Sequence, residues 1–229
     1  MFIGDVHGCA AELETLLDRI GVTAADRVYF VGDLVSRGPE GSRVLAVLRQ
    51  LGASSVMGNH ERRLLDARAL PRHRGPDELK PLVDELAPSD WQWMERLPLW
   101  LDVPEHGVRV VHAGVMPGVP IEDQPPRLLM NLRSINTDGS PSERWGSILW
   151  GARYTGPPHV VFGHNAREGV QLHPWATGLD SGCVYGGALT AMVLDAVEPV
   201  PPAAERQRVL VSVPARRVYF LPQKPKATP

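Results

Sequence analysis

Five short motifs place carboxylate, amide and imidazole side chains directly after apolar segments of strand length, with glycine beside or near each one. Carboxylate and amide oxygens bind hard divalent cations, and imidazole suits first-row metals such as Mn, Fe, Co and Zn. Two such cations about 3.5–4 Å apart can activate a hydroxide and hold a phosphoryl group. Taken singly, each residue could be a helix cap or a hydrogen-bonded histidine. The side chains, in chain order, are Asp5, His7, Asp33, Asn59, His60, His112 and His164.

The segments that must position these side chains are predicted to be strands alternating with helices. Leu13 and Leu16 have helical spacing and predict a helix that ends at Gly21. Pro39 suits the first turn of a second helix, which is expected to end before Gly52. Because the carboxyl ends of parallel strands meet at one edge of a sheet, the polar side chains are expected to converge. The strands are predicted at 1–3, 27–31, 54–57, 99–103, 108–111 and 160–163.

The remaining segments have weaker or different patterns. Residues 62–98 are predicted to be helical, with a capping box from Ser89 to Gln92, and to form an insertion or cap over the site. Residues 115–157 are rich in Pro and Gly and are predicted to be a long loop region. Antiparallel strands are predicted at 189–194, 208–213 and 218–221. We expect one domain over 1–222, including the cap at 62–98, and a flexible tail at 223–229.

The composition excludes several classes of protein. The 229 residues carry a net charge of −2, which gives no general electrostatic footprint for a nucleic-acid duplex. Cys9 and Cys183 are too few for a disulfide framework, so a reducing compartment is expected. The sequence has neither a signal-peptide pattern nor an apolar run that could span a bilayer. These features predict a cytoplasmic protein without membrane contact, and they give no indication of its oligomeric state.

The ordered motifs resemble those of the PPP-type metallophosphoesterases. The motifs are Gly4-Asp5-Val6-His7-Gly8, Gly32–Gly38, Gly58-Asn59-His60-Glu61, His112-Ala113-Gly114 and Gly163-His164-Asn165. The segments 112–117 and 178–187 are more similar to the bacterial diadenosine tetraphosphate hydrolase branch. The resemblance implies an α/β fold, a metallophosphoesterase-type sandwich of two mixed β-sheets flanked by helices, with the helical cap insertion.

The resemblance also implies a role for each matched residue. Asp33 would bridge two divalent ions, with Mn²⁺ favoured and Fe, Co or Zn as alternatives. A hydroxide between the ions would attack phosphorus, and His60 would act as the general acid. Arg37 and Arg133 would hold phosphoryl oxygens, although Arg133 could instead be a surface arginine. Asp5, His7 and Asp33 would bind one ion, and Asp33, Asn59, His112 and His164 would bind the other.

These roles predict an enzyme that hydrolyses phosphoric esters or anhydrides. The branch resemblance implies symmetrical hydrolysis of diadenosine tetraphosphate, a small dinucleoside polyphosphate, to two ADP. One alternative is a phosphatase acting on Ser, Thr or Tyr of a phosphoprotein. A second is a non-catalytic nucleotide or metal sensor. Protein phosphatases of the family have Asp where this chain has Ser36. The neutral hydroxyl of Ser36 could orient His60 by a hydrogen bond, and the absence of the Asp charge favours substrates with good leaving groups.

Several aromatic residues and histidines stand outside the metal-ligand motifs. Trp145, Trp150 and Tyr154 are expected in the core, with a nucleobase platform as the alternative. Tyr185 could reach the site from its glycine-rich turn, or could be purely structural. The other histidines are assigned to the surface or to local hydrogen bonds, and they are His73, His106, His159 and His173.

Overall fold

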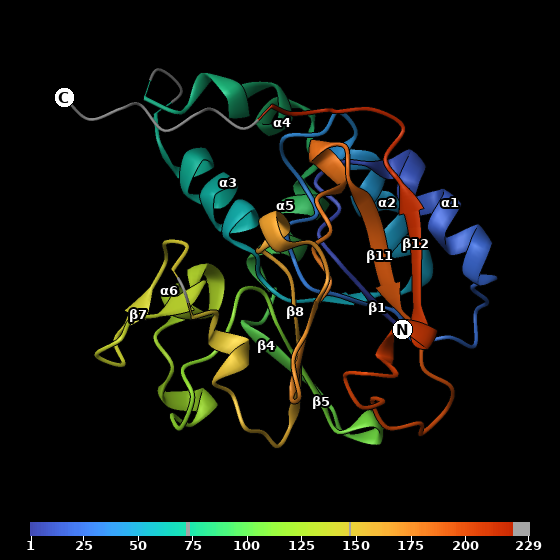
Figure 1. Cartoon of the computed structure of the whole chain (residues 1–229). Helices are drawn as coiled ribbons and strands as arrows, with labels where there is room; N and C mark the ends of the chain where they lie inside the picture. Colours follow the sequence, from blue (N-terminus) through green and yellow to red (C-terminus); the bar gives the residue numbers. More distant parts are fainter. Residues whose placement is uncertain (72–73, 147, 222–229) are drawn as a thin grey trace.

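Two five-stranded mixed sheets form the centre of the molecule (Figure 1). The computed structural model describes residues 1–71, 74–146 and 148–221. The first sheet has the order β12-β11-β1-β2-β3, and the second has the order β4-β5-β8-β10-β9. In the first sheet β1 is parallel to β2 and β2 is parallel to β3, while β11 runs antiparallel to β1. In the second sheet β5, β8 and β10 are parallel. The predicted α/β sandwich is therefore confirmed.

The strands of the two sheets are short, and most lie where the sequence predicts them. The first sheet contains β1 (Phe2–Ile3), β2 (Tyr29–Phe30), β3 (Ser54–Ser55), β11 (Ala188–Met192) and β12 (Leu210–Pro214). The second contains β4 (Trp100–Val103), β5 (Val108–Val111), β8 (His159–Phe162), β9 (Gln171–Leu172) and β10 (Ala176–Gly178). β9 and β10 were not predicted, because residues 171–178 contain neither an apolar run nor a clear alternation of apolar and polar residues.

The core lies between the sheets and on both of their outer faces. Between the sheets, Phe2 of β1 and Val56, which directly follows β3, pack in one cluster with Val110 and Val161 of the second sheet. On the outer face of the first sheet lie α1 (Ala10–Ile20) and α2 (Gly41–Leu51), whose buried leucines and valines form the largest apolar cluster. Both helices end as predicted, at Gly21 and Gly52, because these residues adopt the left-handed conformation that glycine tolerates.

The segment 62–98 is helical, as predicted. It contains the end of α3 (Asn59–Ala69), the 3₁₀ turn η1 (Asp77–Leu79), α4 (Lys80–Glu85) and α5 (Pro88–Glu95). The predicted capping box from Ser89 to Gln92 is wrong. Because Pro88 takes the first helical position, the Asp90 carboxylate accepts the hydrogen bond from the Ala87 N–H at 2.9 Å. In this segment α4 packs against α2, and α5 packs against α3. Its role as a cap stays a prediction.

The segment 115–157 contains more regular structure than the predicted loop. It includes η3 (Ile121–Asp123), α6 (Pro126–Asn131), the hairpin of β6 (Ser134–Ile135) and β7 (Pro141–Ser142), and η4 (Trp150–Ala152). Elements this short do not establish a helical or strand period in the sequence. Leu129, Leu132 and Trp150 nevertheless bury their side chains against the outer face of the second sheet.

The C-terminal segment confirms two of the three predicted antiparallel strands, which are β11 and β12. The strand predicted at 218–221 is wrong. Tyr219 and Phe220 instead both donate their backbone N–H to the Val184 carbonyl, at 3.0 Å each. Further 3₁₀ turns are η2 (Pro104–His106), η5 (Ala166–Glu168), η6 (Cys183–Tyr185) and η7 (Arg206–Val209). The tail predicted at 223–229 lies outside the described residues. In the described part of the chain, no helix is long and apolar enough to cross a membrane.

Candidate metal centre

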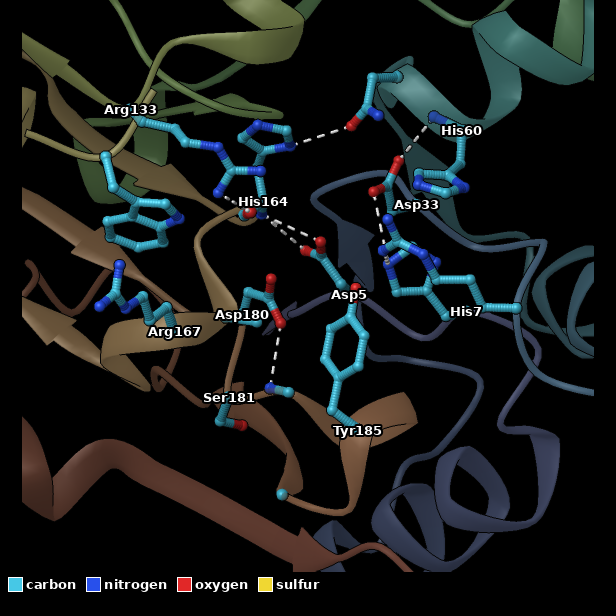
Figure 2. A pocket seen from close by; sticks show the side chains of 16 residues that line it. Asp5, His7, Asp33, His60, Arg133, His164, Arg167, Asp180, Ser181 and Tyr185 are labelled. Carbon is cyan, nitrogen blue, oxygen red and sulfur yellow. Dashed lines mark hydrogen bonds and ion pairs between the residues drawn. The ribbon is translucent and has the colours of Figure 1, made fainter. Parts of the chain in front are cut away.

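The predicted site residues converge on one cavity of about 540 Å³ at the ends of the strands (Figure 2). His112 lies directly behind the wall of this cavity and is fully buried. The convergence follows from the fold, because each motif leaves a strand of one sheet or the other at the same edge. The predicted residues that line the cavity are Asp5, His7, Asp33, Arg37, Asn59, His60, Arg133 and His164.

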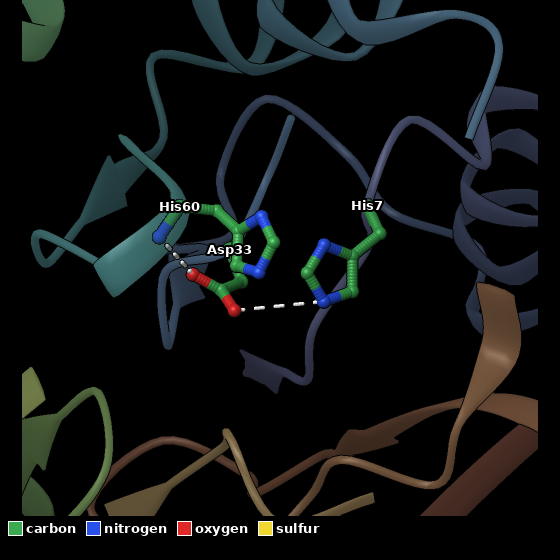
Figure 3. Close-up of side chains that lie close together, drawn as sticks. All are labelled: His7, Asp33 and His60. Carbon is green, nitrogen blue, oxygen red and sulfur yellow. Dashed lines mark hydrogen bonds and ion pairs between the residues drawn. The ribbon is translucent and has the colours of Figure 1, made fainter. Parts of the chain in front are cut away.

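Asp33 lies at the centre of the cluster. One of its carboxylate oxygens, Oδ2, is 3.5 Å from His7 Nε2, and the other, Oδ1, is 3.4 Å from His112 Nε2. Asp33 Oδ1 also accepts a hydrogen bond from the backbone N–H of His60 at 3.0 Å, as Figure 3 shows. The carboxylate therefore faces one imidazole on each side, which is the arrangement that a ligand shared by two ions requires.

Backbone carbonyls fix the orientation of two of these imidazoles. His7 Nδ1 lies 3.3 Å from the Val35 carbonyl oxygen, and His112 Nδ1 lies 2.8 Å from the Val31 carbonyl oxygen. When Nδ1 carries the proton and donates it to a carbonyl, the lone pair of Nε2 is free. This tautomer can bind a metal through Nε2. Both Nε2 atoms point toward Asp33. The local backbone thus leaves both Nε2 atoms available to a metal ion.

Asn59 and His164 complete the second half of the cluster. Asn59 Oδ1 lies 2.9 Å from His112 Nε2 and 2.9 Å from His164 Nδ1. Within this cluster, two sets of ligand atoms are close enough to hold an ion, one from His7, Asp33 and His60 and the other from Asp33, His112 and His164. The first set includes His60, the predicted general acid.

Asp5, which follows β1 of the first sheet, contacts the chain just after β8 of the second sheet. Both of its carboxylate oxygens accept hydrogen bonds from the His164 backbone N–H, at 3.2 and 3.0 Å. A side chain on the neighbouring Gly163 would collide with Asp5 Oδ1. Glycine is therefore required at this position, because the strand end and the carboxylate approach each other closely.

The backbone around the cluster is held in an uncommon conformation. Of the six non-glycine residues with positive φ in the described part of the chain, five lie in these motifs. Such conformations cost about 1–3 kcal/mol each and persist only where the surrounding structure imposes them. The five residues are His7, Asp33, Ser36, Arg37 and His164.

Burial gives the site carboxyl groups an unfavourable environment for negative charge. Desolvation raises the pKa of Asp33 to about 7, despite the hydrogen bond from the His60 N–H. Desolvation, together with the nearby charges of Asp180 and Asp33, raises the pKa of Asp5. The imidazoles show the opposite shift, because burial lowers the pKa of His112 to about 4. Divalent cations would offset the negative charge of the buried carboxylates, and neutral imidazoles are good ligands for them. These residues therefore fit the expected metals.

Two further buried acids, which were not among the predicted site residues, lie at this site. Asp180 lines the cavity beside Asp5, and desolvation raises its pKa. Glu61 lies behind Asp33, and desolvation together with the Asp33 charge raises its pKa to about 7. Asp180 follows β10 by two residues, so the rule that found the other motifs would have found it had β10 been recognised.

The two predicted phosphate-binding arginines also reach the cavity. Arg37 Nη1 lies 3.0 Å from His7 Nε2. Arg133 Nη1 donates hydrogen bonds to the His164 carbonyl at 3.1 Å and to Asn165 Oδ1 at 3.0 Å. Arg133 is therefore a site residue by position, not a surface arginine. The catalytic and ligand roles of all these residues stay predictions.

The hydrogen bond that Ser36 could have made to His60 is not found in the described structure. Ser36 Oγ and His60 Nδ1 are both buried, and neither has a hydrogen-bond partner in the described structure. Ser36 adopts a φ of 72°. Burial, reinforced by the neighbouring His7 and Arg37, lowers the pKa of His60. This environment therefore favours the neutral imidazole.

The aromatic residues divide between the core and the cavity. Trp150 is fully buried and donates from its indole Nε1 to the Ala113 carbonyl, and Tyr154 packs in the same cluster. Trp145 and Tyr185 instead line the cavity. His173 makes a local hydrogen bond to Gln171, as predicted, whereas His106 and His159 bond to the distant Glu198 and Thr177. His73 lies outside the described residues.

Two packed mixed sheets, with Asp, Asn and His gathered at their strand ends and arginines beside them, define a metallophosphoesterase. The chain belongs to the calcineurin-like phosphoesterase family, whose sequence profile matches residues 1–196. The predicted class of enzyme is thus confirmed at the level of the family.

Individual relatives agree with this assignment. A relative from Aromatoleum aromaticum, named a symmetrical bis(5′-nucleosyl)-tetraphosphatase, is 30% identical over 84% of this chain and 92% of its own length. One from Shewanella sp. strain ANA-3 with the same name is 39% identical, but the match spans 51% of this chain and 44% of that relative, which is less than half its length.

Solved structures show the same fold. A crystal structure described as a candidate diadenosine tetraphosphatase has a TM-score of 0.81, with 35% identity over 93% of this chain and 92% of that one. A serine/threonine phosphatase from Saccharomyces cerevisiae has a TM-score of 0.58, with 17% identity over 98% of this chain and 80% of that one. The second likeness concerns the fold alone.

Proposed function

We propose that this protein hydrolyses dinucleoside tetraphosphates symmetrically, giving two nucleoside diphosphates. The observation that carries the proposal is a buried cluster of candidate metal ligands that opens into a cavity lined by Arg37 and Arg133. A tetraphosphate is a chain of anionic groups. It can therefore contact two separate guanidinium groups at once, more readily than a single phosphoryl group can. The names of the relatives that match most of the chain's length support the same substrate class.

The ligands of the proposed site divide around Asp33. Asp5, His7 and Asp33 would hold one divalent ion, and Asp33, Asn59, His112 and His164 would hold the other. Mn²⁺ is favoured by resemblance to the PPP-type branch, with Fe, Co or Zn as alternatives. When bound, such ions supply Lewis acidity and a water molecule of lowered pKa.

The proposed reaction breaks the bond between one central phosphorus and the central bridging oxygen. The oxygen of a water molecule forms a new bond to that phosphorus, and one proton of the water is released to solvent. The bridging oxygen leaves with the second nucleoside diphosphate and takes a proton from His60, which regains one from solvent. Arg37 and Arg133 hold the phosphoryl oxygens and offset their charge as the bond breaks. The negative charge of the bound substrate favours the protonated imidazole of His60.

The distribution of products tests this proposal. The Mn²⁺-loaded protein is incubated with diadenosine tetraphosphate, and the nucleotides are separated by anion-exchange chromatography. Symmetrical cleavage gives ADP as the only nucleotide product, whereas asymmetrical cleavage gives ATP and AMP. ATP and AMP as the main products would contradict the proposed reaction.

The two alternative functions predict different substrate profiles. A phosphoprotein phosphatase would hydrolyse phosphoserine, phosphothreonine or phosphotyrosine peptides far faster than the dinucleotide at equal concentration. A non-catalytic sensor would hydrolyse neither, and would also leave p-nitrophenyl phosphate intact with Mn²⁺ in excess. We expect the dinucleotide to have the highest kcat/KM of the three substrates. Metal content is measured on the same sample, so that an inactive preparation is not mistaken for a sensor.

A further inference from the structure

A second cavity, of about 720 Å³, adjoins the one that holds the candidate ligands. The two cavities share three lining residues, which are Arg37, His60 and Tyr185. Both volumes fall within the range of about 300–1,000 Å³ that small-molecule sites occupy. A second space therefore adjoins the reacting centre, and the proposed reaction assigns no part of the substrate to it.

The first cavity offers a stacked wall of cations and an indole. The guanidinium carbons of Arg133 and Arg167 lie 5.2 and 5.8 Å from the centre of the Trp145 ring. Figure 2 shows Arg133 and Arg167 on the side of Asp5 away from His7 and His60. Arg133 is held near the cluster by the His164 carbonyl, while Arg167 is exposed. This wall combines phosphate-binding charge with an aromatic surface for a base.

The second cavity repeats this combination on the other side. The Arg37 guanidinium lies 5.4 Å from the Tyr185 ring centre and 5.7 Å from that of Phe220. Beyond these residues the cavity is lined by Leu79 of η1 and Leu82 of α4, which provide an apolar surface. A cation thus lies at the end near the reacting centre, and apolar side chains lie farther along.

Polar groups stand at the outer part of the second cavity. Glu78 pairs with Arg63, and Glu85 accepts a hydrogen bond from Ser42. A carboxylate is a poor neighbour for phosphate but a good acceptor for ribose hydroxyl groups. The polarity of the cavity therefore matches a ligand that has its phosphates at Arg37 and its nucleoside toward α4.

We infer that the two cavities are two half-sites for the two identical ends of the dinucleotide. One nucleoside diphosphate lies against Trp145, with its phosphates at Arg133. The other, which departs with the bridging oxygen, lies in the second cavity between Arg37 and Leu82. This inference rests on the proposed function and extends it, because symmetrical cleavage requires two nucleosides at equal phosphate distance from the reacting centre. It also gives η1 and α4 a role in binding substrate.

Inhibition of p-nitrophenyl phosphate hydrolysis by the Mn²⁺-loaded protein tests the inference. The probes are a diadenosine tetraphosphate analogue with a methylene group in place of the central bridging oxygen, and ADP. In the wild-type protein the analogue should bind more tightly than ADP by about tenfold or more, because a second base adds its own contacts. A ratio near one would overturn the inference.

Variants assign each end of the analogue to its cavity. Leu82→Trp fills the second cavity and Trp145→Ala removes the indole of the first, so each should abolish the advantage of the analogue over ADP. Val83→Trp is the matched control for the first variant, because Val83 lies on the same helix and does not line the second cavity. Trp175→Ala is the control for the second, because Trp175 is exposed and lies outside both cavities.

The outcomes separate this inference from the proposed function. An unchanged analogue-to-ADP ratio in a folded Leu82→Trp protein overturns the half-site, even if diadenosine tetraphosphate is cleaved to ADP. Loss of the ratio in a protein that does not cleave the dinucleotide supports the half-site and overturns the proposed function. If circular dichroism shows Leu82→Trp to be unfolded, Pro81→Trp replaces it. Pro81 is exposed and lines the same cavity, so this variant blocks the space without removing core packing.

Discussion

The Glu61 carboxylate accepts a hydrogen bond from the backbone N–H of Asp33 at 2.8 Å, and so holds the turn that carries the central acid of the site. Its Oε1 atom accepts from the N–H groups of Leu34 at 2.8 Å and Val35 at 3.2 Å, and Oε2 also accepts from Gly58 at 3.1 Å. One buried carboxylate therefore satisfies four backbone donors from two motifs. Glu61 is a positioning residue, since it touches none of the reacting groups.

Replacing Glu61 by Ala should destabilise the protein by about 3 kcal/mol, because several buried backbone N–H groups would lose their acceptor. It should also lower Mn²⁺ affinity, because the turn at Asp33 would no longer be fixed. Urea unfolding of the EDTA-treated protein measures the first effect, and metal content after dialysis measures the second. Glu61→Gln keeps one acceptor oxygen and should lie between Ala and wild type.

The control for Glu61 is Glu95→Ala on α5, whose carboxylate is exposed and pairs with Arg68 at 3.2 Å. Surface pairs of this kind contribute little, so we expect a change of less than about 1 kcal/mol. Equal stability and equal metal content in Glu61→Ala and Glu95→Ala would contradict the positioning role.

Asp180→Asn should weaken metal binding by about 10–100-fold, the effect typical of residues that support a ligand. Asp180 lies beside Asp5 and accepts a hydrogen bond from the Gly182 N–H at 3.1 Å. Its charge adds to the negative potential at the cluster, and the amide would remove that charge while keeping the shape. Titration with Mn²⁺ measures the change. Asp138→Asn, at an exposed turn, is the control, and a similar affinity in both variants would refute the assignment.

The sequence predicted the fold and the convergence of the site because both depend on strong local patterns. Apolar segments followed by Asp33, Asn59 and His112 identify strand ends, and helices such as α1 and α2 end at glycine as their periodicity requires. The family and the two-sheet sandwich are therefore confirmed. The cytoplasmic location, the cap and the individual catalytic roles stay predictions.

The features that the sequence did not reveal depend on tertiary contacts. Glu61 looks like an ordinary helix residue, and only the folded chain brings its carboxylate to the Asp33 turn. The segment at 218–221 has the β-branched and aromatic composition of a strand. It forms none because Phe220 instead bonds to Val184 and lies near Arg37. Local propensity cannot register either contact.

His60→Ala distinguishes a general acid from a metal ligand, since the His60 ring lies close enough to His7 and Asp33 for either role. We expect the variant to retain both metal ions. It should lose about 10²-fold in rate on alkyl phosphates, which have poor leaving groups, and far less on p-nitrophenyl phosphate. Metal content and the two rates are measured on one preparation. Loss of one ion would identify His60 as a ligand, and equal rate losses on both substrates would rule out its acid role.

His159 provides a prediction about stability that is independent of catalysis. The residue is buried at the start of β8, with Nε2 2.8 Å from Thr177 Oγ1. Burial, reinforced by the Arg206 charge, lowers the pKa of His159 to about 3. The unfolded chain takes up a proton at this residue below about pH 6.5, whereas the folded protein does not. Stability from this residue is therefore present above about pH 6.5 and is lost as the pH falls toward 3.

Replacing His159 by Gln should remove this part of the pH dependence. Between pH 6.5 and 5 the wild-type protein should lose up to about 2 kcal/mol through His159, and His159→Gln should lose correspondingly less over the same interval. The free energy of unfolding is measured in urea at both pH values, with EDTA present so that metal release does not contribute. Thr177→Val is the control, because it removes the hydrogen-bond partner without removing the titrating group. Thr177→Val should lower stability at both pH values and keep the wild-type change of stability with pH. An equal change with pH in wild type and His159→Gln would show that the buried imidazole does not cause it.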